Sequence, residues 1–269
     1  MAALLDELRV YRRITGAALR SQMQYKASFT LGMGIDFLTV FADFLPIYFL
    51  MLKFGGLEEW TILELCLLYG MVEISWAMVE SLLRGFEDFG PYLIRGDVDR
   101  WLLRPRSLFM QIAAHEFELR RLGRVVQGVV VLMIGAAGLG LGLQSWLWIA
   151  TGILSGMLFF TGVVMLGAAS QFWTLGQTSE LQNMLTYGGS AALTYPVSIY
   201  SRWFRRAITY AVPLAFVNYF PVLAALGRVE EAGFPAWVPF LSPGVCLGVL
   251  LLARGSFALG LRRYESTGS

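Results

Sequence analysis

Apolar residues run in long stretches along this 269-residue chain, and polar residues gather between them. The clearest stretches lie at 29–52, 61–83, 122–143, 146–170 and 236–261. The hydrocarbon core of a bilayer is about 30 Å thick and takes roughly 20 apolar residues of one helix. Each stretch is long enough for one crossing, so the pattern predicts an all-α integral membrane protein.

The region between the fourth and the last stretch allows two topologies. Both 178–198 and 207–226 are moderately apolar, and three arginines separate them: Arg202, Arg205 and Arg206. If 207–226 crosses, every basic residue except Lys53 and Arg228 lies on the cytoplasmic side, as the positive-inside rule favours. If 178–198 crosses instead, 207–226 is a re-entrant segment on the outer side, and the three arginines lie outside as well. Either version gives six transmembrane helices with both termini in the cytoplasm.

Prolines break the second half of the chain at short intervals, at Pro196, Pro213 and Pro221. Broken backbone at membrane depth survives only when it is buried in protein or lines a cavity. We therefore favour the second topology, with 196–226 as a re-entrant segment before the last span.

Composition agrees with a single transmembrane unit over 1–269. Hydrophobic residues make up 57% of the chain and charged residues 15%, whereas globular domains run near a quarter charged. Six spans leave little chain for a soluble domain. The net charge of +2 is small, and the basic residues cluster at span ends, which argues against a nucleic-acid partner.

Two polar segments border the first two spans. Residues 1–26 alternate apolar and basic positions as an amphipathic helix lying on the cytoplasmic face of the membrane would. The range 84–107 holds five arginines and two prolines, so it predicts a cytoplasmic loop containing one short helix. Its mixture of aromatic residues, acids and arginines suits docking to another protein. A helix lying on lipid is the alternative, which the acids of this loop disfavour because such helices prefer lysine and arginine.

Four carboxylates lie within the first two spans: Asp36, Asp43, Glu73 and Glu80. Charged residues inside spans are rare and usually face a bundle interior or a wet cavity. Each pair is spaced seven residues apart and so lies on one helix face. These faces could line a pathway for a cationic or zwitterionic substrate. The alternative is structural, for example with Glu80 paired to Arg84 one turn further on.

Sequence signatures of catalysis are missing from the chain. It has no phosphate-binding loop, no metalloprotease helix, no nucleophile elbow and no Cys/His metal spacing. We read His115 as an interfacial polar residue and both Cys66 and Cys246 as small buried hydrophobes. The glycines at 135, 138, 140 and 142 include a pair spaced for close helix packing. We expect a protein that is no enzyme and binds no metal or cofactor itself.

The chain resembles the permease subunits of type-two ABC exporters, in a bacterial branch without a fused ATPase. The resemblance rests on the order of the segments and on three stretches: Gly96 to Pro105 within IRGDVDRWLLRPRS, Tyr195 to Pro221, and the closing Arg263 to Ser266. It implies a dimer in the bacterial inner membrane, formed with an identical or a related permease. Each half docks a separate ATPase subunit, which binds ATP and Mg, through a coupling helix in the first cytoplasmic loop.

The resemblance places the coupling helix at 84–107 and outer re-entrant helices at 196–226. We expect the ATPase contacts to be Phe86, Phe89, Tyr92, Leu93 and Trp101, with Asp88, Asp97, Arg100 and Arg104 as polar supports. The acidic span faces suggest a hydrophobic cationic drug as the exported substrate. A lipid, glycolipid or polysaccharide is the second possibility.

Other classes of membrane protein fit less well. A secondary transporter would explain the intramembrane acids, but six spans are few and the two halves show no convincing repeat. An embedded enzyme needs an activated nucleophile, and Ser75, Ser155 and Ser170 have no histidine near in sequence. A membrane assembly protein without transport activity stays open, since sequence alone does not show a pathway.

Overall fold

A computed structural model describes residues 26–54, 60–118, 121–174 and 193–264, together with Gly16, 20–22 and Gln24. Every regular element in these ranges is a helix. The predicted N-terminal amphipathic helix over 1–26 lies almost wholly outside the described residues. The chain is an all-helical membrane protein, as the apolar stretches predicted.

Five described helices are long and apolar enough to cross a membrane. They are α2 (Lys26–Phe54), α3 (Ile62–Glu87), α7 (Leu122–Leu139), α8 (Leu143–Thr174) and α12 (Ser242–Arg262). Each coincides with one predicted span, with ends that differ by a few residues. A bent pair of shorter helices raises the number to six if it is one span.

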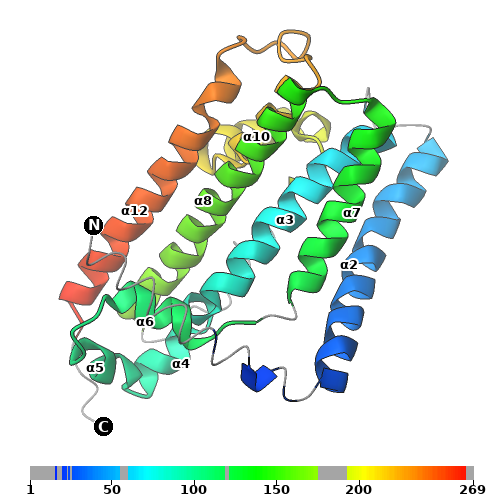
Figure 1. The fold of residues 1–269 in the computed structure, drawn as a ribbon. Coiled ribbons are helices and arrows are strands. Elements are labelled where there is room, and N and C mark those ends of the chain that lie inside the picture. Colours follow the sequence, from blue (N-terminus) through cyan, green and yellow to red (C-terminus); the bar gives the residue numbers. More distant parts are fainter. Residues whose placement is uncertain are drawn as a thin grey trace.

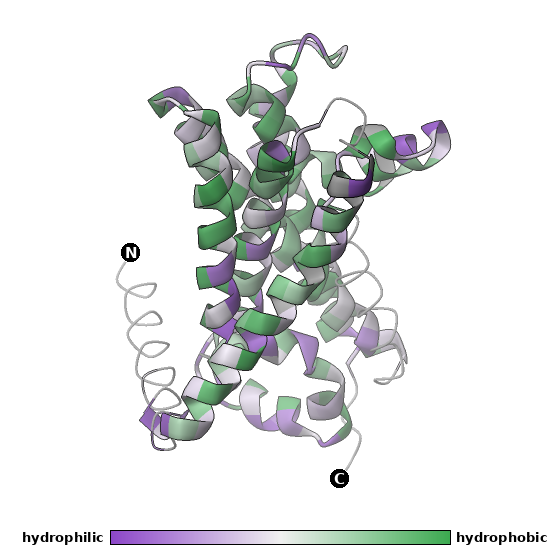
Figure 2. Ribbon diagram, turned by 90° about the vertical axis from the view of Figure 1, so that its right-hand side faces the viewer, coloured by the Kyte–Doolittle hydropathy of each residue, from purple (hydrophilic) through white to green (hydrophobic). Residues whose placement is uncertain are grey.

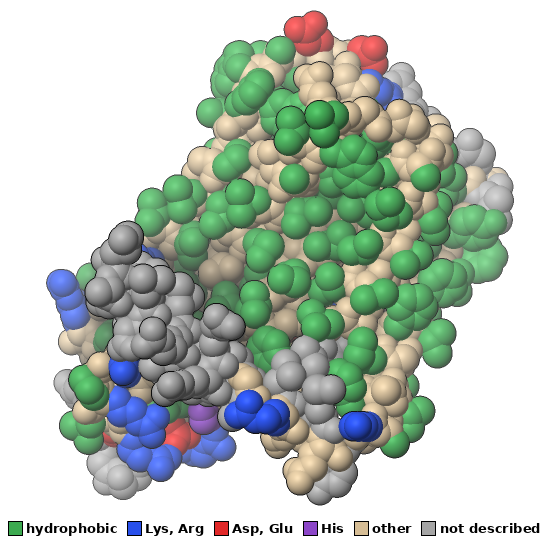
Figure 3. Space-filling model, in the orientation of Figure 1, with side chains coloured by type: hydrophobic (Ala, Val, Ile, Leu, Met, Phe, Trp, Pro, Cys, Tyr) green, Lys and Arg blue, Asp and Glu red, His purple; other side chains and the backbone are tan. Residues whose placement is uncertain are grey.

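The five long helices stand side by side in the order α2, α7, α3, α8, α12 (Figure 1). Helix α3 lies in the middle of this row, and most of its residues are buried. Figure 2 shows apolar residues around the middle of the bundle and polar residues toward its two ends, and Figure 3 shows charged side chains gathered at those ends. This is the distribution that a bilayer requires, because the apolar band faces lipid.

Small residues let α3 and α7 approach closely. A Cβ added to Gly70 would lie 2.8 Å from the carbonyl oxygen of Gly128, and one added to Gly135 would lie 2.6 Å from that of Leu63. The packing role predicted for the glycines of this span holds for Gly135 and for Gly138, which also abuts Leu63. It fails for the other two: Gly140 ends α7 with a φ of 60°, and Gly142 faces open space.

The region before the last span is broken, as its prolines predicted. It consists of η3 (Val197–Ile199), α10 (Arg202–Arg206), η4 (Ala207–Ala211), η5 (Leu214–Phe216) and α11 (Tyr219–Ala225). The chain bends by 66° between 202–209 and 214–225. The buried amide of Asn218 ties this segment inward, because its nitrogen donates to the carbonyls of Leu68 on α3 and of Leu193. Most of 178–198, the fifth span in the topology that we favoured, lies outside the described residues.

The first cytoplasmic loop differs from its prediction. We expected one short helix within 84–107, but α3 continues to Glu87 past a non-helical residue, Leu83. Three short helices follow: α4 (Phe89–Ile94), α5 (Asp97–Leu102) and α6 (Leu108–His115). Gly96, with a φ of 71°, separates α4 from α5, and only glycine adopts that conformation without strain.

Candidate functional site

Four phenylalanines join the first cytoplasmic loop to the ends of the long helices. Phe86 and Phe89 lie at the end of α3 and the start of α4, and Phe172 and Phe257 come from α8 and α12. Ring centroids lie 5.2 Å apart for Phe89 and Phe172, 5.5 Å for Phe89 and Phe257, and 5.2 Å for Phe172 and Phe257. We call these four residues the aromatic hub. A displacement of α4 must therefore move α8 and α12, because close-packed rings transmit strain.

A second set of rings holds the short helices to one another. Tyr92 of α4, Trp101 of α5 and His115 of α6 lie within 4.8 to 5.4 Å of each other, centroid to centroid. The Tyr92 hydroxyl also donates to the carboxylate of Glu116. His115 thus joins three helices, a contact that the sequence did not predict. Through these rings α4, α5 and α6 form one packed unit.

The predicted ATPase contacts lie inside this unit. Phe86 and Phe89 are completely buried, and Tyr92, Leu93 and Trp101 expose at most 5% of their surface. Their contact with an ATPase stays a prediction, but in this conformation they support the loop and do not form its surface. Apart from Pro91, Pro105 and His115, the exposed residues of the unit are aliphatic or basic: Ile94, Arg95, Arg100, Leu102, Leu103, Arg104 and Arg106. We call them the loop surface, and Leu103 is the most exposed apolar residue in it, at 87%.

The residues predicted as polar supports also fall into two groups, one inside the loop and one on its surface. The carboxylate of Asp88 lies 3.1 Å from the guanidinium of Arg84. That of Asp97 bonds to Arg100 and lies 3.3 Å from Arg95. These two acids stabilise the loop from within, whereas Arg100 and Arg104 face outward.

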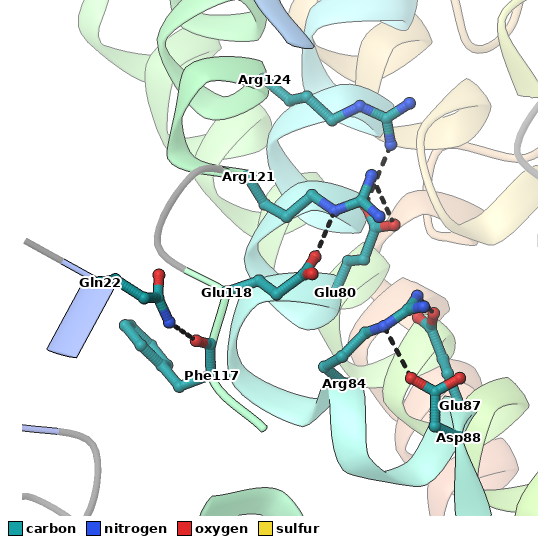
Figure 4. Close-up of polar contacts among 9 residues, drawn as sticks. All are labelled: Gln22, Glu80, Arg84, Glu87, Asp88, Phe117, Glu118, Arg121 and Arg124. Carbon is teal, nitrogen blue, oxygen red and sulfur yellow. Dashed lines mark hydrogen bonds and ion pairs between the residues drawn. The ribbon is translucent and has the colours of Figure 1, made fainter. Parts of the chain in front are cut away.

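Glu80 forms a buried ion-pair network where the end of α3 meets the start of α7 (Figure 4). Its completely buried carboxylate lies 3.1 Å from Arg121 and 2.9 Å from Arg124, both on the α7 side. Arg121 also bonds to Glu118 at 2.8 Å. Arg84, which the sequence suggested as the partner of Glu80, lies against Glu87 and Asp88, and the two arginines that pair with Glu80 come from another helix. Such neutralisation favours a structural role for Glu80 over contact with a substrate.

Two of the other span acids lie deeper, at the depth of a buried glutamine. A Cβ added to Gly123 would touch the carbonyl oxygen of Met33. A Cβ added to Gly128 would lie 3.1 Å from the Cβ of Glu73. Asp36 and Gln127 come three and four residues after the first contact, and α2 and α7 run in the same direction (Figure 1). With a rise of about 1.5 Å per residue, Asp36, Glu73 and Gln127 share one level. The side chain of Asp43 lies outside the described part of the structure.

Gln127 points into the wedge between α2 and α3. Gly123 faces α2 and Gly128 faces α3, and at about 100° per residue Gln127 lies between these directions. It is 1% exposed, and neither polar atom of its amide has a hydrogen-bond partner; the Oδ2 atom of Asp36 is likewise buried without one. An unpaired buried amide costs about 1–3 kcal/mol. The polar side chains at this level therefore lower the stability of the fold, and helix packing alone does not explain why they are there.

At the opposite end, Glu64 ties α3 to the loop before α12. Its carboxylate accepts from the Thr61 amide at 2.8 Å, the Thr61 hydroxyl accepts from the Glu64 amide at 3.4 Å, and together they form a capping box. The other carboxylate oxygen lies 2.9 Å from Arg228, whose guanidinium stands 5.7 Å from the centre of the Trp60 ring. The order Thr-x-x-Glu before an apolar run could have revealed the cap. Nothing in the sequence pairs Glu64 with Arg228, which is 164 residues away.

A cavity of about 300 Å³ lies beside this contact. Buried residues form its inner part: Trp60, Val197, Thr209, Tyr219, Phe220 and Leu223. Its mouth carries Arg205, Arg228, Glu231, Ala232 and Phe234. The broken segment thus encloses an aromatic pocket with charges at the opening. We call it the outer cavity.

Comparison with known proteins places these features in a family. No curated protein and no solved structure matches the chain. A family model described as "ABC-2 family transporter protein" matches residues 37–268, which takes in the larger part of α2, the other four long helices, α4 to α6 and the broken segment. The chain belongs to the ABC-2 transporter family, as a multi-pass membrane permease component of an ABC transporter.

Proposed function

We propose that this permease belongs to an ATP-driven exporter and receives its energy from separate ATPase subunits. The observation that carries the proposal is the loop surface, built on a unit whose rings reach α8 and α12. In the described ranges this is where exposed leucines and arginines gather on a folded loop between spans. ATP and Mg would bind the ATPase, and this chain would bind no cofactor and carry out no catalysis.

The mechanism follows from the packing. Closure of two ATPase subunits on ATP would push α4 and α5, which meet the ATPase at the loop surface. Phe89 would pass the displacement to α8 and α12 through the aromatic hub, since a close-packed contact cannot absorb it. The permease would then alternate between inward-open and outward-open forms.

A second permease, identical or related, completes the proposed exporter. Its contact would use the outward face of α2, where Leu31, Leu38 and Phe49 are each at least 60% exposed. The assembly would lie in the inner membrane of a bacterium with both termini in the cytoplasm. The basic residues at the α4–α6 end agree with that orientation.

Docking can be tested with one exposed leucine. The ATPase is co-expressed with the permease, and Leu103→Asp is compared with Leu143→Asp, an equally exposed leucine at the other end of the bundle. Leu103→Asp should prevent co-purification and abolish ATPase stimulation, whereas Leu143→Asp should change neither. Co-purification that survives Leu103→Asp would remove the docking role. We chose Leu103 over Trp101 because loss of a buried ring would damage the loop itself.

For the substrate we propose first a hydrophobic cation, because Asp36 and Glu73 lie at one level with Gln127 inside the membrane. Carboxylates in a low-dielectric environment favour a positive ligand. In reconstituted exporter, Asp36→Asn and Glu73→Gln should each reduce transport of a cationic dye at least tenfold, with Glu230→Gln, at an exposed acid outside the spans and outside the cavity, as the control. Unchanged transport in both would reject this class. The second candidate is a lipid or glycolipid, which the outer cavity favours.

A further inference from the structure

Gln127 is an uncharged polar side chain that the packing of α7 leaves without a partner. It is 1% exposed, and both its amide nitrogen and its amide oxygen are buried with no hydrogen bond to the described part of the chain. The other buried carboxamide that ties two segments together, Asn218, donates to two carbonyls. Native folds pair nearly all such groups, so an exception requires an explanation.

The helices around Gln127 are held together with unequal tightness. A Cβ on Gly128 would lie 3.2 Å from the backbone nitrogen of Ile74, so α3 and α7 meet backbone to backbone and leave no space for a ligand between them. Helix α2, at the edge of the row, is different (Figure 1). Of its described side chains only Phe44 and Met51 are buried. The side of Gln127 that can yield is therefore the one toward α2.

Two contacts of α2 border the level of Gln127. On one side a Cβ on Gly123 would lie 2.7 Å from the carbonyl oxygen of Met33, and on the other the rings of Phe44 and Tyr69 lie 5.0 Å apart. Asp36 lies between these contacts, and its Oδ2 atom is buried without a hydrogen-bond partner in the described ranges. A carboxylate and an amide thus share a short stretch of the α2 interface.

The chemistry of the two groups defines their complement. A carboxylate only accepts hydrogen bonds and attracts positive charge, whereas a carboxamide both donates and accepts. A hydrophobic cation without further polar atoms would satisfy Asp36 and leave Gln127 unpaired. A ligand that carries an amide next to its charged group would satisfy both, because one amide pairs with another through N–H and C=O together.

We propose that Gln127 selects, among cationic ligands, those that carry an amide beside the charged group. The ligand amide would donate to Oε1 and accept from Nε2 of Gln127, while its ammonium group faces Asp36 and Glu73. Entry would displace α2 and leave the contact of α3 with α7 intact. This inference rests on the proposed function for the cationic part of the ligand, and it makes Gln127 a specificity-determining residue.

The probes are procainamide and procaine, which carry the same tertiary ammonium group and differ in one atom of the linker. Procainamide has an amide there, and procaine has an ester that accepts but cannot donate. Binding of tritiated procainamide to the permease in phosphatidylcholine nanodiscs, with procaine as competitor, gives both affinities without an ATPase. Procainamide should bind about tenfold more tightly, because procaine leaves Oε1 of Gln127 unpaired.

Gln127→Met replaces the amide with an apolar side chain of similar length, and the two affinities should then agree within twofold. Its melting temperature should equal or exceed that of the wild type, because an unpaired buried amide has been removed. Gln171→Met is the matched control, since Gln171 is completely buried on α8, away from α2, and it should leave the tenfold preference in place.

Four results would overturn the proposal: no saturable binding of either probe, equal affinities in the wild type, a preference that survives Gln127→Met, or a lower melting temperature of that variant. The last would mean that the amide is paired within the fold.

Asp36→Asn separates this inference from the proposed substrate class. It should weaken binding of both probes by the same factor and keep their ratio, because it removes the charge and leaves Gln127 intact. A preference that persists while Asp36→Asn weakens neither probe would support the role of Gln127 and reject the cationic class. Weaker binding of both probes in Asp36→Asn, without any preference in the wild type, would retain the cationic class and reject the role of Gln127.

Discussion

The two ends of α3 are built in opposite ways. At the end that carries α4 to α6, rings from α3, α4, α8 and α12 interlock, and Arg84 and Arg121 each lie beside a carboxylate. At the outer end the neighbouring segment is bent by 66°, is rich in arginine, and encloses a cavity. A tightly packed end transmits displacement, whereas a broken end leaves room for a ligand. The two ends of this helix therefore differ in how closely their surroundings are packed.

Loss of a hub ring should produce the largest effect. Phe89→Ala removes a completely buried phenyl ring, and such a truncation costs about 3–5 kcal/mol in free energy of unfolding. Thermal unfolding of the purified permease should show it. Phe240→Ala, which removes a ring that is 69% exposed, should cost less than about 1 kcal/mol. Equal losses in the two variants would mean that the cytoplasmic end is no better packed than the outer end.

Breaking the buried ion pairs should come next. Glu80→Gln leaves Arg121 and Arg124 without their shared carboxylate, and loss of one partner in a buried pair costs about 3–5 kcal/mol. We expect the lower end of that range, because both arginine side chains keep 15–16% exposure. Glu118→Gln, at a carboxylate that is 28% exposed, should cost below about 1 kcal/mol. A stable Glu80→Gln variant would show that Glu80 is not structural and would restore its predicted place in a substrate pathway.

At the outer end, a smaller effect is expected from Glu64→Gln. Glutamine can still complete the capping box, so the loss is confined to the ion pair with partly exposed Arg228, about 1 kcal/mol or less. Hydrogen exchange should rise in 227–237 and stay constant in α4 and α5. Faster exchange at the cytoplasmic end would contradict the independence of the two ends.

The smallest effect concerns alkaline pH at the cytoplasmic end. Burial of the Tyr264 hydroxyl, with the nearby carboxylate of Asp99, raises the pKa of this tyrosine to about 12. An unfolded tyrosine ionises near pH 10. The stabilising contribution is therefore complete below about pH 10 and is lost as pH rises toward 12. Melting temperatures of the wild type and Tyr264→Phe should run parallel up to pH 10, and only the wild type should show this additional fall above it.

Much of the fold follows from local sequence, because a bilayer imposes length and polarity on each span. The five long helices and the proline-broken segment were predictable for that reason. Asp36, Glu73 and Glu80 could be identified as unusual, but their partners could not, since Arg121 and Arg124 reach Glu80 through helix packing that no local pattern encodes. Gln127 gave no signal, because one amide in an apolar helix is unremarkable until its neighbours are known.

The loop that holds α4 and α5 shows the other limit of sequence reasoning. Aromatic residues in a polar loop indicated an interaction surface, yet Phe89 packs against α8 and α12, about 80 to 170 residues later in sequence, and Tyr92 and Trp101 pack against His115. The docking residues we expected therefore support the surface, and Leu103 at its edge was overlooked. Amphipathic pattern alone cannot separate a face that meets a partner from one that meets the chain itself.

The place of α2 at the edge of the row has a consequence for biogenesis. Its neighbour is α7, which begins roughly 70 residues after α2 ends. At about 5–20 residues per second of synthesis, α2 waits about 3–14 seconds in the membrane before α7 exists. During that interval the carboxylate of Asp36 cannot pack between the helices that neighbour it in the finished fold. The order of translation therefore sets when α2 acquires the neighbour against which it packs in the finished fold.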